Sequence, residues 1–139
     1  MTTAPVTRLA SRSTVLTVLI GILGTALAVS ALAFGALALG ATPGFAPLNP
    51  PVYLAFAVLG LLAGVAGWIV VTRRVRRPLR LLRVLVPALV VLSWIPDVIL
   101  LATGFIPGAS PLGVAALMLM HPVVAAAAVL VGRRIAPAS

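Results

Sequence analysis

The chain has 139 residues, of which 63% are hydrophobic, and a formal net charge of +9. This composition excludes an ordinary soluble domain, in which about half of the residues are apolar. All ten basic residues are arginines, and they flank long apolar segments, so we predict a membrane protein rather than a protein that binds nucleic acid. The absence of cysteine excludes disulfides, thiolate metal ligands and thiol redox chemistry.

Four apolar segments are each long enough to cross a membrane as a helix, which takes about 20 residues. Short connections rich in Gly and Pro follow the first and third segments, so consecutive helices should pack antiparallel. The sequence therefore predicts a single all-α domain, a four-helix transmembrane bundle of two antiparallel helical hairpins. The length of the first segment favours an uncleaved span over a signal peptide, whose apolar region has about 7 to 15 residues. The expected spans are residues 15–39, 52–71, 84–103 and 112–131.

Arginine is confined to three stretches, which lie before the first span, between the second and third, and after the fourth. Basic residues next to membrane spans stay on the cytoplasmic side, so we predict a multi-pass protein of the inner membrane with both termini in the cytoplasm. The middle stretch is also expected to contact lipid headgroups, at about 1 kcal/mol per arginine. It contains Arg73, Arg74, Arg76, Arg77, Arg80 and Arg83, and the terminal stretches contain Arg8, Arg12, Arg133 and Arg134.

Small residues spaced four apart mark faces on which helices approach each other closely in lipid. Gly60 and Gly64 form such a pair in the second span, and Gly24 and Ala28 form one in the first. We expect these faces to dock against each other within the monomer. A homodimer or an unidentified membrane partner is the alternative.

Two ionisable side chains lie within the predicted spans. Asp97 is the only acidic residue of the chain and His121 is the only histidine. At about 1.5 Å per residue they lie roughly 10 and 15 Å below the outer ends of their helices, so the hairpin allows a contact. Ionisable residues at this depth indicate a function, here a proton or ligand site. The two groups could form an ion pair or a neutral hydrogen-bonded couple.

A purely structural role is the alternative for both side chains. Pro87 and Pro96 are each expected to kink the third span. Asp97, which follows Pro96, could bond to the local backbone or to Ser93, and His121 could donate to a carbonyl that Pro122 frees. Neither arrangement requires a ligand.

The fourth span and part of the third resemble a family of small four-span membrane proteins of actinobacteria, known only as a domain of unknown function. The resemblance implies an inner-membrane four-helix bundle and makes His121 a family feature, but it implies no activity. It rests on residues 115–128, with Leu117, Met118, Met120, His121 and Val123, and on residues 92–96.

The sequence predicts a non-enzymatic protein without a cofactor or a metal, because it has no phosphate-binding loop, no paired carboxylates and too few metal ligands. Two function classes follow. The first is a structural, assembly or accessory role through helix packing. The second is a small transporter or proton-coupled carrier that uses Asp97 and His121.

Overall fold

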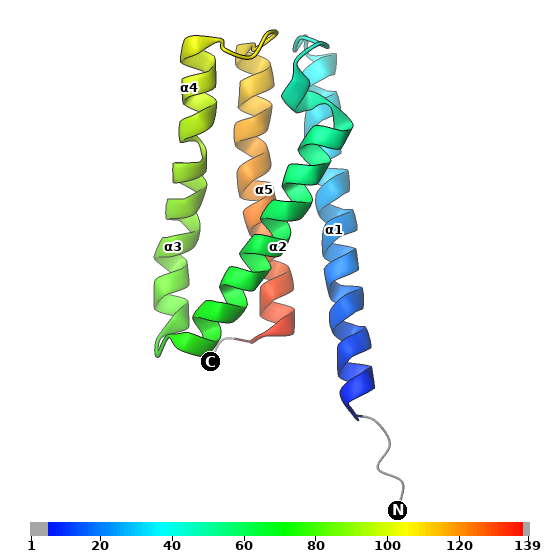
Figure 1. Ribbon diagram of the computed structural model, residues 1–139, viewed down its shortest axis with the longest axis vertical. Coiled ribbons are helices and arrows are strands. Elements are labelled where there is room, and N and C mark those ends of the chain that lie inside the picture. Colours follow the sequence, from blue (N-terminus) through cyan, green and yellow to red (C-terminus); the bar gives the residue numbers. More distant parts are fainter. Residues whose placement is uncertain (1–5, 138–139) are drawn as a thin grey trace, which may run out of the picture.

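The computed structural model describes the backbone of residues 6–137 and the side chains of residues 12–137. Every regular element in this range is helical, and four helical segments are long and apolar enough to cross a membrane. The predicted four-helix bundle is therefore confirmed, although each span differs from its expected bounds by a few residues. The elements are α1 (Val6–Ala38), the short 3-10 helix η1 (Ala46–Leu48), α2 (Pro50–Arg74), α3 (Pro78–Ser93), α4 (Ile95–Thr103) and α5 (Pro111–Ile135) (Figure 1).

The third span consists of two helices, α3 and α4, with a break at Trp94. Pro96 causes the break, because it has no amide hydrogen for the carbonyl one turn earlier. The span also begins at Pro78 rather than at residue 84, since proline is well suited to the first position of a helix. The kink predicted at Pro96 is thus a short interruption one turn before Asp97, whereas α3 continues through Pro87 without a break.

Helix α5 is the centre of the bundle. It packs along α1 and α2, whereas α3 and α4 make fewer contacts with it. In Figure 1, α2 crosses the molecule obliquely, so that it starts beside α1 and ends beside α3. Because α2 and the third span meet only near the short link between them, they diverge toward the other end of the bundle.

The glycine face of α2 packs against α5, not against the first span. A Cβ atom on Gly64 would lie 2.6 Å from Cβ of Ala128, and one on Gly60 would lie 3.1 Å from Cγ1 of Val124. These glycines let the two backbones approach closely, as small residues do between helices in membranes. The residues were predicted as a packing face, but their expected partner was wrong.

The packing face predicted on α1, with Gly24 and Ala28, was also wrong. No atom of another helix lies within 4 Å of a Cβ placed on Gly24. The buried face of α1 instead contains Gly21, which contacts Val131, and Thr25 and Val29, each four residues further along. Residues four apart share one side of a helix, so Gly24 faces away from the bundle.

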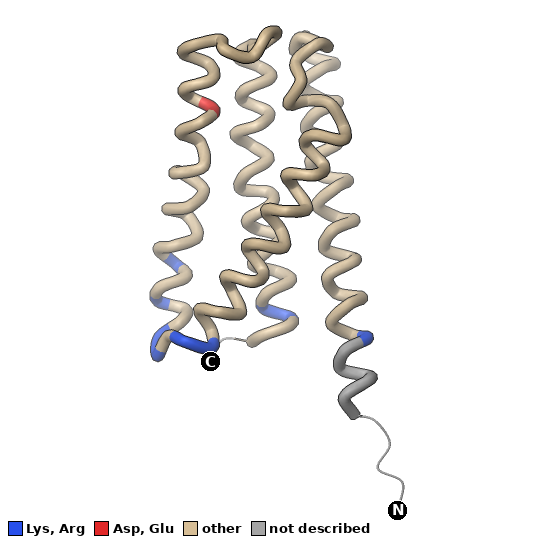
Figure 2. Tube along the Cα trace, in the orientation of Figure 1, with Lys and Arg blue, Asp and Glu red and all other residues tan. Residues whose placement is uncertain are grey.

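The arginines gather at one end of the bundle. Every arginine with a described side chain is exposed at this end, while Asp97 lies near the opposite end (Figure 2). Helix α1 begins and α5 ends at the arginine end, and both uncharged connections lie at the other (Figure 1). The side chain of Arg8 is outside the described residues. This separation is what the predicted topology requires, and the side of the membrane on which each end lies stays a prediction.

Candidate intramembrane binding site

A cavity of about 850 Å³ lies between α2 and the third span, with α5 behind it. It exists because α2 tilts away from α4 while the small residues of α2 leave space along its wall. Phe56 on one side and Leu89 on the other line the cavity and are exposed, so the cavity opens sideways, toward lipid in a membrane. Its walls are almost entirely apolar, and the small residues of α2 that line it are Ala57, Gly60, Ala63, Gly64 and Gly67.

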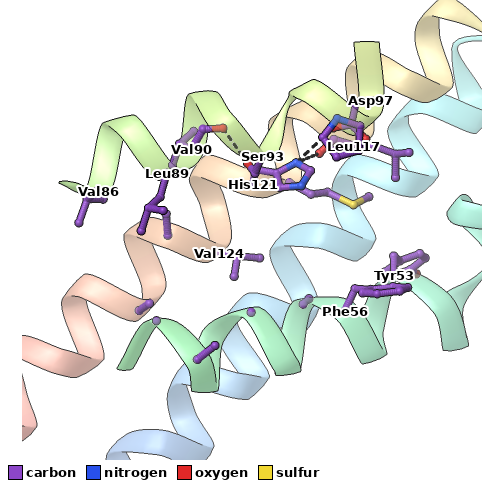
Figure 3. Close-up of a pocket in the computed structure, with 18 of the residues that line it drawn as sticks. Tyr53, Phe56, Val86, Leu89, Val90, Ser93, Asp97, Leu117, His121 and Val124 are labelled. Carbon is purple, nitrogen blue, oxygen red and sulfur yellow. Dashed lines mark hydrogen bonds and ion pairs between the residues drawn. The ribbon is translucent and has the colours of Figure 1, made fainter. Parts of the chain in front are cut away.

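Asp97 and His121 meet in the cavity wall. Asp97 lies in the first turn of α4 and His121 in the middle of α5, and Oδ2 of Asp97 is 3.4 Å from Nδ1 of His121 (Figure 3). The contact that counting along the helices allowed is therefore formed. The distance is too long for a strong hydrogen bond, and Nδ1 is closer to the Leu117 carbonyl oxygen, at 2.9 Å.

Oδ2 of Asp97 is consequently buried without a hydrogen-bond partner among the described residues. The Asp97 side chain is mostly buried, whereas His121 is partly exposed within the cavity. An Nδ1 proton of His121 would be donated to the carbonyl of Leu117 and would only approach the carboxylate. The pair therefore offers a carboxylate oxygen with unused acceptor capacity at the edge of an apolar cavity.

Ser93 lines the same cavity but does not bond to Asp97. Its hydroxyl donates to the carbonyl oxygen of Val90 at 2.6 Å, one turn earlier in α3 (Figure 3). A hydroxyl that bonds back to its own helix is common in membrane helices and relieves the backbone near a break. Ser93 was considered as a hydrogen-bond partner of Asp97. In the structure it lines the cavity and bonds to Val90 instead.

The indole of Trp94 holds the start of α4 against α5. Its Nε1 donates to the carbonyl oxygen of Met118 at 2.8 Å, and Met118 is the residue whose carbonyl Pro122 leaves without an amide donor. His121 does not fill this role, because its ring turns to Leu117 instead. Nothing in the sequence pattern predicts this bond, since the two residues meet only after the third and fourth spans have packed.

The titratable residues that line the cavity do not form a cluster of metal ligands in the described part of the chain. These residues are Tyr53, Asp97 and His121, and the Tyr53 hydroxyl donates to Ser30 Oγ at 3.2 Å. In the described part of the chain, no three His, Cys, Asp or Glu side chains lie close enough to hold a metal ion. A typical protein zinc site uses three or four such ligands.

Comparisons of the chain with protein-family models, with curated proteins and with solved structures give no match. The resemblance to the actinobacterial four-span family therefore stays a prediction. What the chain does has to be inferred from the cavity and from the two ionisable groups in it.

The contact between Asp97 and His121 predicts that their substitutions are not additive. We expect Asp97→Asn and His121→Ala together to change the free energy of unfolding by an amount that differs from the sum of the single changes by about 1 kcal/mol. The measurement is unfolding of the purified protein in mixed detergent micelles. Asp97→Asn combined with Thr103→Val is the control, because the Thr103 hydroxyl bonds only to Ile99 within α4. Additive effects in both cycles would contradict the contact.

Proposed function

We propose that this protein is a small, non-enzymatic membrane carrier that couples the movement of a guest molecule to that of a proton. The observation that supports the proposal is the contact between Asp97 and His121 inside an apolar cavity that opens toward lipid. Carboxylates at membrane depth are costly, and they commonly mark proton relays and substrate paths. The imidazole of His121, 3.4 Å from this carboxylate, offers a second group on which the proton can reside.

The proposed orientation places the arginine end in the cytoplasm, following the charge rule for membrane proteins. Asp97 then lies in the outer half of the membrane, close to the two uncharged connections. The cavity reaches those connections through Ala46, Pro47, Phe105 and Ile106. A guest would accordingly enter from the outer half of the bilayer or from the outer surface.

An accessory role through helix packing is the second candidate. Its support is weaker than the sequence suggested, because Gly60 and Gly64 already pack against α5 within the chain. The observation that still favours it is the open space at Gly24 on the outer face of α1. An oligomer that dissociates on Gly24→Leu substitution, measured by light scattering in detergent, would favour this role.

Reconstitution in liposomes that contain a pH-sensitive dye tests the carrier. A gradient of organic cations, organic anions or neutral amphiphiles is applied in separate experiments, and proton movement is compared with that in protein-free liposomes. We expect at least one class to drive proton movement, and Asp97→Asn to abolish it. Thr103→Val, in the same helix but bonded only to its own backbone, should leave it intact. If no class of guest moved protons, the carrier function would be wrong.

A further inference from the structure

We propose that the cavity binds amphipathic organic cations, with the charged centre of the guest beside the Asp97 carboxyl group and its apolar body along the wall of α2. Because it names the guest of the proposed carrier, this inference rests on that function. It follows from three features of the site, namely the charge of its polar group, the chemistry of its walls and the place of His121.

The charge of the guest follows from Asp97. This residue is 7% exposed, and its Oδ2 has no hydrogen-bond partner among the described residues. A buried carboxylate oxygen without a partner is unfavourable, so a cation in the cavity next to the Asp97 side chain is stabilised. The neighbouring Nδ1 of His121 is 2.9 Å from the Leu117 carbonyl and does not satisfy this oxygen. The site therefore accepts one positive group.

The amphipathic shape of the guest follows from the walls. Away from Asp97 and His121, the cavity extends along α2 past Gly60, Ala63 and Gly67. On the opposite side it is lined by large apolar residues of α3, such as Leu85 and Leu89. A hydrophilic cation would lose its hydration in such a cavity without replacement, whereas an apolar body with one delocalised or shielded charge loses little.

The guest and a proton on His121 would compete for the same carboxylate. The groups that face Asp97 from the packed elements are His121 of α5, Ser93 of α3 and Tyr53 across the cavity on α2. Both hydroxyls are engaged in other hydrogen bonds, and no arginine of the described chain lines the cavity. His121 is thus the lining residue that can place a competing positive charge beside the carboxylate, at 3.4 Å.

Tetraphenylphosphonium and tetraphenylborate test the charge preference, because they share shape and size and differ in sign. Their binding to the full chain in nonionic detergent is measured by equilibrium dialysis against protein-free micelles. We expect the cation to bind roughly tenfold or more tightly than the anion, and Asp97→Asn to weaken cation binding by roughly tenfold or more. The control Thr103→Val should change neither. The net charge of +9 would by itself favour the anion, so a cation preference has to come from the carboxylate.

Anion binding as tight as cation binding by the unsubstituted protein would overturn the proposal, and this result does not depend on the folding of any variant. Unchanged cation affinity in Asp97→Asn would also overturn it. The liposome experiment distinguishes failure of the cation site from failure of the carrier function. Proton movement driven only by anions or neutral amphiphiles contradicts the cation site and leaves the carrier, whereas cation binding without proton movement supports the site and contradicts the carrier.

Discussion

We expect Phe45→Ala to destabilise the bundle by about 4 kcal/mol, because the substitution removes a fully enclosed aromatic ring. Phe45 is 0% exposed although it lies in a connection between helices. A Cβ on Gly113 would lie 3.0 Å from Cδ1 of Phe45, and one on Gly108 would lie 3.3 Å from its backbone nitrogen. The ring therefore packs against the start of α5, while the backbone of Phe45 lies against Gly108 in the second connection. Loss of the ring leaves a cavity at this junction.

The measurement for Phe45→Ala is the free energy of unfolding in mixed detergent micelles. Phe105→Ala is the matched control, because Phe105 lies in the other connection and is 65% exposed. It should change the free energy by less than about 1 kcal/mol. Similar losses for the two variants would show that the enclosed ring of Phe45 does not stabilise the bundle more than an exposed one.

Gly64→Val is expected to cost about 3 kcal/mol through overpacking between α2 and α5. A Cβ at this position would lie 2.6 Å from Cβ of Ala128, and both atoms are attached directly to a backbone. No change of rotamer can relieve the clash, so the helices have to separate. Separation would also disturb the neighbouring contact between Gly60 and Val124.

Gly67→Val is the control for Gly64→Val. Gly67 is in the same helix and also lines the cavity, but nothing lies within 4 Å of a Cβ placed there. Unfolding of both variants in the same micelles should show a loss for Gly64→Val and a change within about 0.5 kcal/mol for Gly67→Val. Equal losses would assign the effect to valine in the helix rather than to packing against α5.

Much of the candidate site could be predicted by counting along the spans. Asp97 and His121 are the only residues of their kinds, and their depths in an antiparallel hairpin are similar, so a contact could be expected. The hydrogen-bond partners of the neighbouring residues Ser93 and Trp94 could not be predicted in this way. Ser93 bonds to Val90, and Trp94 takes the Met118 carbonyl that was considered for His121, because each donor finds the nearest free acceptor once the helices have packed.

The faces on which the helices pack could also be predicted only in part from the sequence. Gly60 and Gly64 could be recognised from their spacing, yet the identical spacing at Gly24 and Ala28 gives no packed glycine. In lipid every face of an apolar helix is tolerated by the surroundings, so composition does not reveal which face turns inward. On α1 the inward face contains Gly21, Thr25 and Val29, and only the position of α5 distinguishes it from the others.

The sequence by itself determined that the chain forms four membrane-spanning helices and that its arginines gather at one end. These properties depend on length, apolar content and the places of Gly, Pro and Arg, each of which acts locally. The tertiary structure decided where a cavity lies and which oxygen in it is left without a partner. Both depend on the tilt of α2 away from the third span and on the break at Trp94, which arise only when the helices pack together.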